Sequence, residues 1–189
     1  VHKCLVLDLD DTLWGGIVAD DGLEGIVLGQ GSGVGEAFLG VQEAALSLRT
    51  RGVLLAVCSK NDESNARLPF QKHPEMLLKE DHIAAFFANW SDKASNLEAI
   101  AKSLNISLDS LVFLDNNPAE REQVRQALPQ VAVPELAEDP TLYARYLMLG
   151  GYFESLAFTK EDRERGGQYL ADTGRAKAAA SAQIGRAHV

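Results

Sequence analysis

The chain has 189 residues, of which 46% are hydrophobic and 24% charged, and its 18 basic against 27 acidic residues give a net charge of −9. This length suffices for one α/β domain with a sizeable core. The acidic balance argues against a nucleic-acid partner, because little positive charge is available to displace counterions. No apolar run approaches the ~20 residues of a membrane span, and no signal peptide opens the chain. We therefore expect a cytoplasmic protein that binds neither nucleic acid nor membrane.

Short apolar runs alternate with amphipathic stretches, a pattern typical of a parallel sheet with crossover helices. Each run is nearly continuous in apolar character, as expected of strands covered on both faces. The predicted strands are Cys4–Leu9, Val53–Ser59, Ala84–Ala88, Leu111–Asp115 and Val131–Val133. The predicted helices are Glu36–Thr50, Ser91–Leu104 with Ser91 as N-cap, Pro118–Leu128 and 139–149. The sequence thus predicts a five-stranded α/β sheet.

Residues 15–29 follow a different pattern, with two short β-type runs on either side of Asp20-Asp21-Gly22. An Asp-Gly turn between such runs is typical of a hairpin. Because this segment comes directly after the first strand and its acidic loop, we expect a small β-hairpin flap there. No insertion is long enough to form a large cap domain.

Polar side chains follow each of the first four predicted strands or open the helix after it. They are Asp8 and Asp10 in Asp8-Leu9-Asp10-Asp11-Thr12, then Ser59 and Lys60, Lys93, and finally Asp115-Asn116. Two carboxylates at the end of a buried strand are costly unless a cation or hydrogen-bond donors satisfy them. Open α/β sheets gather their ligands at this edge. The set therefore indicates magnesium-dependent phosphoryl transfer.

This set resembles the four motifs of the haloacid dehalogenase (HAD) superfamily, which implies a three-layer Rossmann-like fold. The resemblance implies that Asp8 is a nucleophile forming an aspartyl-phosphate and that Asp10 is the general acid/base. Ser59 and Lys93 would hold phosphoryl oxygens, and Thr12 and Lys60 beside these motifs complete the expected phosphate-binding set. For Mg²⁺, the resemblance implies Asp8, the main chain of Asp10 and the fourth motif, Asp115 and Asn116, as ligands.

The physical need for such a cation follows from charge. A carboxylate that attacks a phosphate dianion meets repulsion, which a hard divalent cation and Lys93 would neutralise. The fourth motif reads Asp115-Asn116 where an Asp-Asp pair is usual. Since Asn116 offers an uncharged carbonyl oxygen, we expect weaker metal binding and an orienting role for Asp115 toward Lys93.

Longer phrases resemble the FkbH-like family from Lys3 to about Tyr169, among them LDLDDTLWGG, LLAVCSKND, FFANWSDKASNL and FLDNNPAERE. The resemblance implies a role in polyketide-type biosynthesis, in which a glyceryl unit passes from 1,3-bisphosphoglycerate to an acyl carrier protein. Attack of Asp8 on the acyl phosphate at phosphorus would release free glycerate. We therefore expect this domain to remove the 3-phosphate ester, and acyl transfer to rest on residues beyond it.

Alternatives remain open on the same residues. The chain could be a stand-alone phosphatase of small phosphomonoesters, a non-catalytic interaction domain, or a nucleic-acid end phosphatase, which its acidity disfavours. Cys58 could carry an acyl group, but strand alternation points it away from Ser59 and into the core. Arg121 could reach a substrate anion or form a surface ion pair.

The predicted domain organisation has three parts. Residues 1–149 form the HAD-like catalytic domain, and residues 150–183 begin a C-terminal segment or truncated second domain. The last six residues, Ile184 to Val189, read like the translation of a sequencing-library adapter. We expect them to be an artefact.

Overall fold

The computed structural model describes residues 1–154, 164–165, 167–169 and 171–178. Its elements follow in the order β1 (Cys4–Leu7), α1 (Val18–Gly25), α2 (Gly33–Thr50), β2 (Leu54–Ser59), α3 (Glu63–Lys72), η1 (Glu80–His82), β3 (Ile83–Ala88), α4 (Lys93–Leu104), η2 (Leu108–Ser110), β4 (Leu111–Leu114), α5 (Pro118–Ala127), η3 (Pro140–Leu142) and α6 (Tyr143–Leu149). The predicted segment 150–183 is described only in part, and residues 184–189 lie outside the described residues.

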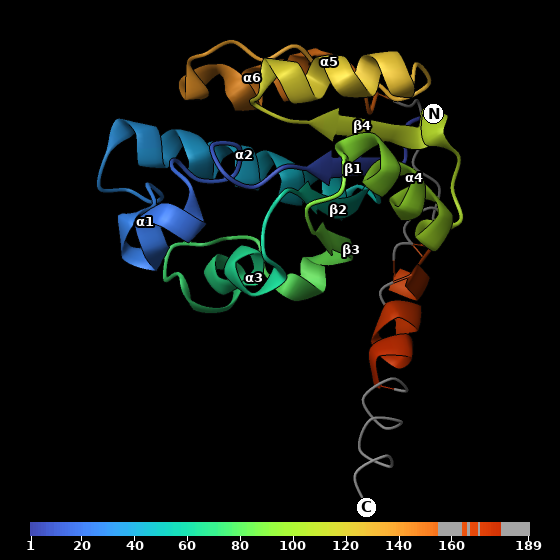
Figure 1. The fold of residues 1–189 in the computed structure, drawn as a ribbon, viewed down its shortest axis with the longest axis horizontal. Helices are drawn as coiled ribbons and strands as arrows, with labels where there is room; N and C mark the ends of the chain where they lie inside the picture. Colours follow the sequence, from blue (N-terminus) through green and yellow to red (C-terminus); the bar gives the residue numbers. More distant parts are fainter. Residues whose placement is uncertain (155–163, 166, 170, 179–189) are drawn as a thin grey trace, which may run out of the picture.

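Four parallel strands form the sheet in the order β3-β2-β1-β4. Alternate residues of each strand enter two separate cores, because successive side chains point to opposite faces. Leu5 and Leu7 of β1 join the core that contains α2 and α3, whereas Cys4 and Val6 join the core that contains α4. Figure 1 shows α2 and α4 on opposite sides of the sheet. The three-layer α/β architecture expected from the sequence is confirmed.

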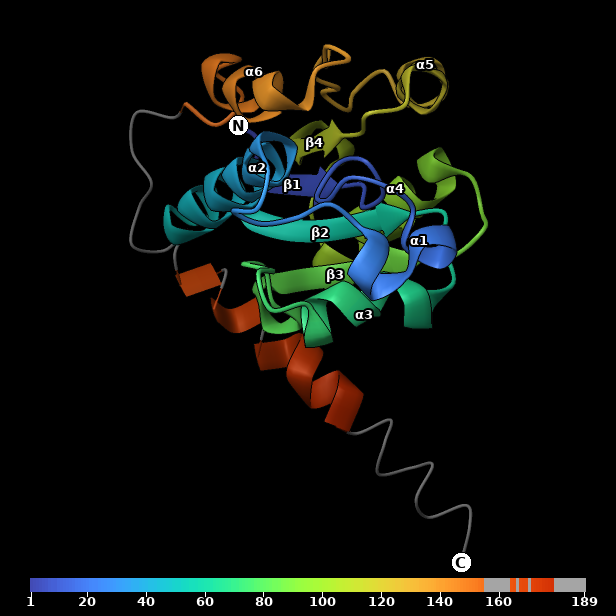
Figure 2. The same cartoon turned by 90° about the vertical axis from the view of Figure 1, so that its left-hand side faces the viewer.

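The helices at the two sheet edges complete the arrangement. Both α5 and α6 lie beside the β4 edge and α3 lies beside the β3 edge (Figure 2). Helix α3 was not predicted, because its mean hydropathy is low and Pro69 lies inside it. Its buried Ala66 and Phe70 are four residues apart and therefore share one face. Within the described residues, no helix has the length and apolar character needed to cross a membrane.

The predicted fifth strand, Val131–Val133, is wrong. Only a single parallel bridge joins Val112 to Ala132. Pro129 and Pro134 flank this segment and lack the amide protons that a longer ladder would need. The sheet therefore has four strands, and Ala132 extends it at one point.

The predicted hairpin at residues 15–29 is also wrong. Residues 18–25 form α1, which is kinked at Gly22, where φ is 70° and the backbone is not helical, and the only β-type pairing in this segment is one antiparallel bridge between Gly15 and Val27. The Asp21 carboxylate accepts a hydrogen bond from the Ile17 amide at 2.8 Å. This bond favours a helical start over an extended strand, because helix N-termini carry unpaired amides. The segment is still small, and the expectation that no large cap is present is confirmed for the described residues.

Candidate active site

The residues singled out in the sequence meet at the carboxyl edge of the sheet. Asp8 follows β1, Ser59 ends β2, Lys93 opens α4 after β3, and Asp115 follows β4. They line a cavity of about 370 Å³, whose described lining is Asp8, Asp10, Asp11, Ile17, Ser59, Lys60, Trp90, Lys93, Asp115, Asn116, Asn117 and Glu120. The parallel topology thus brings together side chains that are more than a hundred residues apart in sequence.

Lys93 is the centre of a buried ion cluster. Its Nζ lies 2.8 Å from Asp8 Oδ1, 3.0 Å from Asp115 Oδ2 and 3.1 Å from the main-chain oxygen of Cys58. Asp92, not the predicted Ser91, caps α4 by accepting from the Ser95 amide, and this cap places Lys93 in the first turn. The ammonium group therefore has three acceptors, two of them carboxylates.

Burial sets the electrostatics of this cluster. Burial raises the pKa of Asp8 to about 7; the Lys93 ammonium opposes this rise and the Asp115 carboxylate adds to it. Burial alone would lower the pKa of Lys93, but the adjacent Asp8 and Asp115 carboxylates raise it above its usual value. Lys93 therefore remains a cation. With both carboxylates ionised, the cluster has one negative charge that Lys93 does not neutralise.

Thr12 connects the first motif to the fourth. Its Oγ1 lies 3.3 Å from Asp8 Oδ2 and 3.2 Å from Asn116 Oδ1, and it accepts a hydrogen bond from the Asn116 amide at 3.2 Å. A hydroxyl has only one proton, so it can donate to just one of these two oxygens at a time. The other oxygen needs a second positive partner. Asp8 Oδ2 and Asn116 Oδ1 are therefore two acceptor oxygens near one hydroxyl group, and both can serve as metal ligands.

Asp10 accepts hydrogen bonds from three donors. Its Oδ1 accepts from Trp14 Nε1 at 3.0 Å and from the Val18 amide at 2.9 Å, and its Oδ2 accepts from Asn61 Nδ2 at 2.9 Å. Burial raises the pKa of Asp10, while the hydrogen bonds from Val18 and Trp14 lower it. Sequence reasoning missed Asn61, although it lies only two residues after Ser59, in the loop between β2 and α3.

Ser59 and Lys60 occupy different parts of the cavity. Ser59 is buried among its lining residues. The Lys60 ammonium lies 2.9 Å from Glu120 Oε1 of α5, where both side chains are partly exposed. Lys60 is thus at the mouth of the cavity, paired across it, while Lys93 is at the bottom.

Arg121 supports the site from behind. Its Nη1 donates to the main-chain oxygens of Asp115 at 3.0 Å and Asn116 at 2.9 Å, and its Nη2 donates to Glu135 at 2.9 Å. Of the two sequence-based interpretations of Arg121, the ion pair with an acid is present, to Glu135, but the arginine side chain is buried and does not line the cavity. Its role is to hold the loop between β4 and α5.

The two tryptophans lie in different environments. Trp14 is fully buried, whereas Trp90 on the cavity rim is 68% exposed and donates from Nε1 to Asp62 Oδ1 at 3.0 Å. Trp90 and Ile17 are the apolar members of the cavity lining. A substrate that enters the cavity would pass these two side chains.

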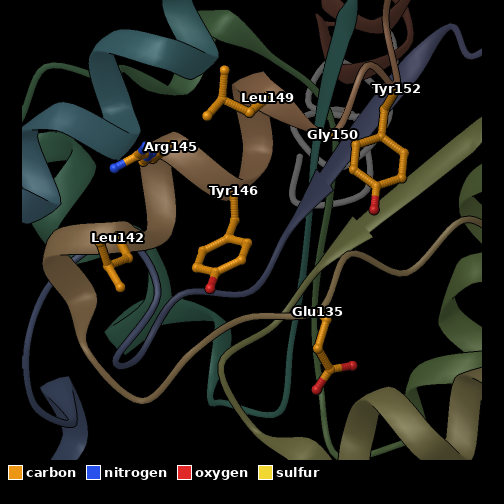
Figure 3. A pocket seen from close by; sticks show the side chains of 7 residues that line it. All are labelled: Glu135, Leu142, Arg145, Tyr146, Leu149, Gly150 and Tyr152. Atoms are coloured by element: carbon orange, nitrogen blue, oxygen red, sulfur yellow. The ribbon is translucent and has the colours of Figure 1, made fainter.

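A second cavity, of about 480 Å³, lies elsewhere in the described structure. Its lining residues are Glu135, Leu142, Arg145, Tyr146, Leu149, Gly150 and Tyr152. Figure 3 shows these side chains spread over α6 and the neighbouring loops, with no pair of carboxylates among them. The first cavity is smaller, but it is the one that contains the cluster of Asp8, Lys93 and Asp115.

No model of a known protein family matches the chain, and no curated protein matches it. Among solved structures, it is similar to the N-terminal part of BF1531 from Bacteroides fragilis, which contains a phosphatase domain and was crystallised with Mg. The identity is 53%, the TM-score 0.81, and the match covers 82% of this chain. The chain shares the fold of this part of BF1531. The chain spans only 42% of the length of the BF1531 chain.

Two further solved structures are less similar. An uncharacterized protein from Corynebacterium glutamicum matches with a TM-score of 0.52 and 10% identity, over 83% of this chain and 99% of the other. A HAD family enzyme from Bacteroides thetaiotaomicron, in complex with magnesium and inorganic phosphate, reaches a TM-score of 0.49 at 12% identity, over 74% and 97% of the two chains. The second similarity is too low to support any statement about the site.

Proposed function

We propose that this chain is a Mg²⁺-dependent phosphate-ester hydrolase domain in which Asp8 is the nucleophile. The observation that supports it is the Asp8 carboxylate, buried between Lys93 and Thr12 at the carboxyl edge of the sheet. Next to it lies Asp10, whose pKa is raised by burial, as suits a group that must donate and accept protons. The similarity to a phosphatase domain crystallised with Mg supports the same proposal.

The residues present fit a magnesium ion. Among the described residues, no three His, Cys, Asp or Glu side chains form a metal site. Mg²⁺, however, commonly uses one or two carboxylates together with water and substrate phosphate oxygens. Asp8 Oδ2 and Asn116 Oδ1 share one hydroxyl proton and would hold the ion, with the main chain of Asp10 as a further donor. Bound there, the ion would supply positive charge between the Asp8 carboxylate and the phosphoryl oxygens.

The chain's own residues account for two proton-coupled steps. In the first, a carboxylate oxygen of Asp8 bonds to phosphorus while the bond from phosphorus to the leaving oxygen breaks, and Asp10 gives that oxygen its proton. In the second, Asp10 removes a proton from the water that attacks the aspartyl-phosphate, which releases inorganic phosphate and restores Asp8. Ser59 holds the phosphoryl oxygens, with Lys60 and Thr12 as further contacts, and the Lys93 ammonium beside Asp8 supplies positive charge opposite the phosphoryl group.

An assay with a generic aryl phosphate tests this function. Turnover should require Mg²⁺, disappear with EDTA and return when Mg²⁺ is added. Asp8→Asn should reduce turnover by about 10³-fold or more, because it removes the nucleophile. Asp81→Asn is the matched control, since Asp81 is exposed in η1. Metal-independent turnover, or an active Asp8→Asn variant, would refute the proposal.

The finer proposal is that the substrate carries a phosphoglyceryl group. The sequence phrases that resemble the FkbH-like family support it, as does a cavity of about 370 Å³, which suits a small phosphorylated molecule. The chain would remove the 3-phosphate ester after a glyceryl unit has passed from 1,3-bisphosphoglycerate to an acyl carrier protein. Asp10 would protonate the alkoxide, which is a poor leaving group without a proton.

Incubation with a carrier protein and 1,3-bisphosphoglycerate separates this role from that of a stand-alone phosphatase. The test uses a protein that also contains the acyl-transfer residues. Its Asp8→Asn variant should accumulate the 3-phosphoglyceryl carrier, detected by intact-protein mass spectrometry, and the unaltered protein the dephosphorylated form. Phosphatase activity without any acylated carrier would favour the stand-alone phosphatase. Absence of both activities would favour a non-catalytic interaction domain.

A further inference from the structure

The three hydrogen-bond donors around Asp10 are divided unequally between its two carboxylate oxygens. Oδ1 accepts two hydrogen bonds, from the Trp14 indole and the Val18 amide. Oδ2 accepts one, from Asn61 Nδ2 at 2.9 Å. A carboxylate oxygen has two lone-pair directions, so Oδ1 is fully used by the protein and Oδ2 has one direction left. The proton of a protonated Asp10 therefore sits on Oδ2, in the direction that Asn61 leaves open.

The hydrogen bond to Asp10 is the one that the buried Asn61 side chain makes among the described residues. This side chain is 98% buried, since only 2% of its surface is exposed. Its Nδ2 donates to Asp10, and its Oδ1 has no hydrogen-bond partner among the described residues. A buried amide that is only half satisfied by the protein is unfavourable for folding. Its conformation is therefore explained by what it does for Asp10, not by a stabilising network of its own.

The position of Asn61 in the chain connects the two halves of the site. It lies in the loop between β2 and α3, two residues after the proposed phosphate contact Ser59. The other two donors, Trp14 and Val18, belong to the segment that follows Asp10 itself. Asn61 is thus the described donor that ties Asp10 to the phosphate-binding side of the cavity.

We propose that Asn61 is a positioning residue for the general acid/base: it aims Asp10 Oδ2 at the oxygen that leaves phosphorus. This inference rests on the proposed function. In the first step the proton moves from Oδ2 to the leaving oxygen as the bond from phosphorus to that oxygen breaks. In the second step Oδ2 takes a proton from the attacking water. Asn61 itself exchanges no proton and touches no reacting atom.

Substrates whose leaving groups differ in their need for a proton test this role. An alkyl phosphate needs a proton on its leaving oxygen, whereas 2,4-dinitrophenyl phosphate leaves readily without one. Asn61→Leu keeps the branching and the number of side-chain heavy atoms and removes both the donor and the unsatisfied oxygen. The thermal midpoint of unfolding checks that the larger Leu side chain is accommodated. We expect kcat/KM for the alkyl phosphate to fall about 10- to 100-fold. For 2,4-dinitrophenyl phosphate, kcat/KM should change less than about threefold, because kcat/KM reports the first phosphoryl transfer.

Two controls keep the test specific. Asn65→Leu makes the same change four residues later, at a half-buried position in α3, and should leave both values unchanged. In an Asp10→Asn background, Asn61→Leu should have no further effect, because its target is already inactive. If Asn61→Leu does not fold, Asn61→Ala provides the same comparison with a smaller side chain that has no donor.

The results with the two substrates support or overturn the positioning role of Asn61. Equal losses with both substrates, or an unchanged kcat/KM for the alkyl phosphate, would overturn it, and so would an additive effect on top of Asp10→Asn. Failure of the proposed function is recognised separately, because the unaltered protein would then hydrolyse neither phosphate ester in a Mg²⁺-dependent manner.

Discussion

Lys93 and Arg121 are two buried cations that both bind the loop that follows β4. They are 3% and 2% exposed, so burial does not distinguish them. Lys93 faces the cavity and binds two carboxylates, Asp8 and Asp115, whereas Arg121 binds the main-chain oxygens of Asp115 and Asn116 and an exposed partner, Glu135. The type of acceptor therefore separates a cation placed for chemistry from one placed for structure.

The largest expected effect is that of Lys93→Met on turnover. The variant loses the positive charge opposite Asp8, and kcat should fall about 10²- to 10³-fold, as when one preorganised donor to a developing charge is removed. Lys102→Met, on the exposed face of the same helix α4, is the matched control and should keep full activity. The measurement is steady-state hydrolysis of an aryl phosphate with saturating Mg²⁺. Turnover within threefold of the unaltered protein would remove Lys93 from the site.

Arg121→Met should affect stability instead. It leaves the oxygens of Asp115 and Asn116 without their donor, and a buried unsatisfied polar group costs about 1–3 kcal/mol. We expect the free energy of unfolding in urea to fall by about 2–4 kcal/mol. Arg125→Met is the control: Arg125 lies one turn later in α5 and also pairs with Glu135, but its side chain is 36% exposed, so its loss should cost about 1 kcal/mol or less. Equal losses for both variants would contradict the comparison.

Asn116→Asp changes the loop that both cations bind. It replaces a neutral oxygen near Asp8 with a charged one, so the affinity for Mg²⁺ should rise by roughly one order of magnitude, since ligand charge tunes such sites. Isothermal titration with Mg²⁺, compared with the unaltered protein and with Asn117→Asp next to it, measures this. An affinity that does not respond to Asn116→Asp would exclude Asn116 as a ligand.

The sequence predicted the sheet well because its strands are buried on both faces. Continuous apolar runs identified four parallel strands to within two residues at each end, and the polar residues after them do meet in one cavity. The segments that were wrong have weak local signals. Residues 131–133 are β-prone but flanked by prolines, and residues 18–25 become helical through the Asp21 side chain and contacts that no periodicity reveals.

The sequence predicted the site residues that belong to a motif. It did not predict those that reach the site only through the three-dimensional arrangement of the loops. Asp8 and Lys93 lie 85 positions apart, yet both end up at the strand edge that the parallel order dictates. Asn61 acts through one hydrogen bond to the Asp10 carboxylate, and Arg121 through one bond to each of two main-chain oxygens. These bonds depend on the conformation of the loops. Residue type and spacing carry no information about such conformations.

Replacing Cys58 gives the smallest expected effect. It tests whether Lys93 depends on the Cys58 side chain or only on its main-chain oxygen. Lys93 Nζ binds the main-chain oxygen of Cys58 at 3.1 Å, so Cys58→Ala keeps that bond. The side chain is buried in the core that contains α4, and burial raises the pKa of its thiol to about 12, which makes it a poor nucleophile at neutral pH. Cys58→Ala should therefore keep turnover within about twofold, lose about 1 kcal/mol of stability, and still support acyl loading where that occurs. Loss of carrier acylation with intact phosphatase activity would instead make Cys58 the acyl acceptor, and the buried thiol would need a route to the cavity.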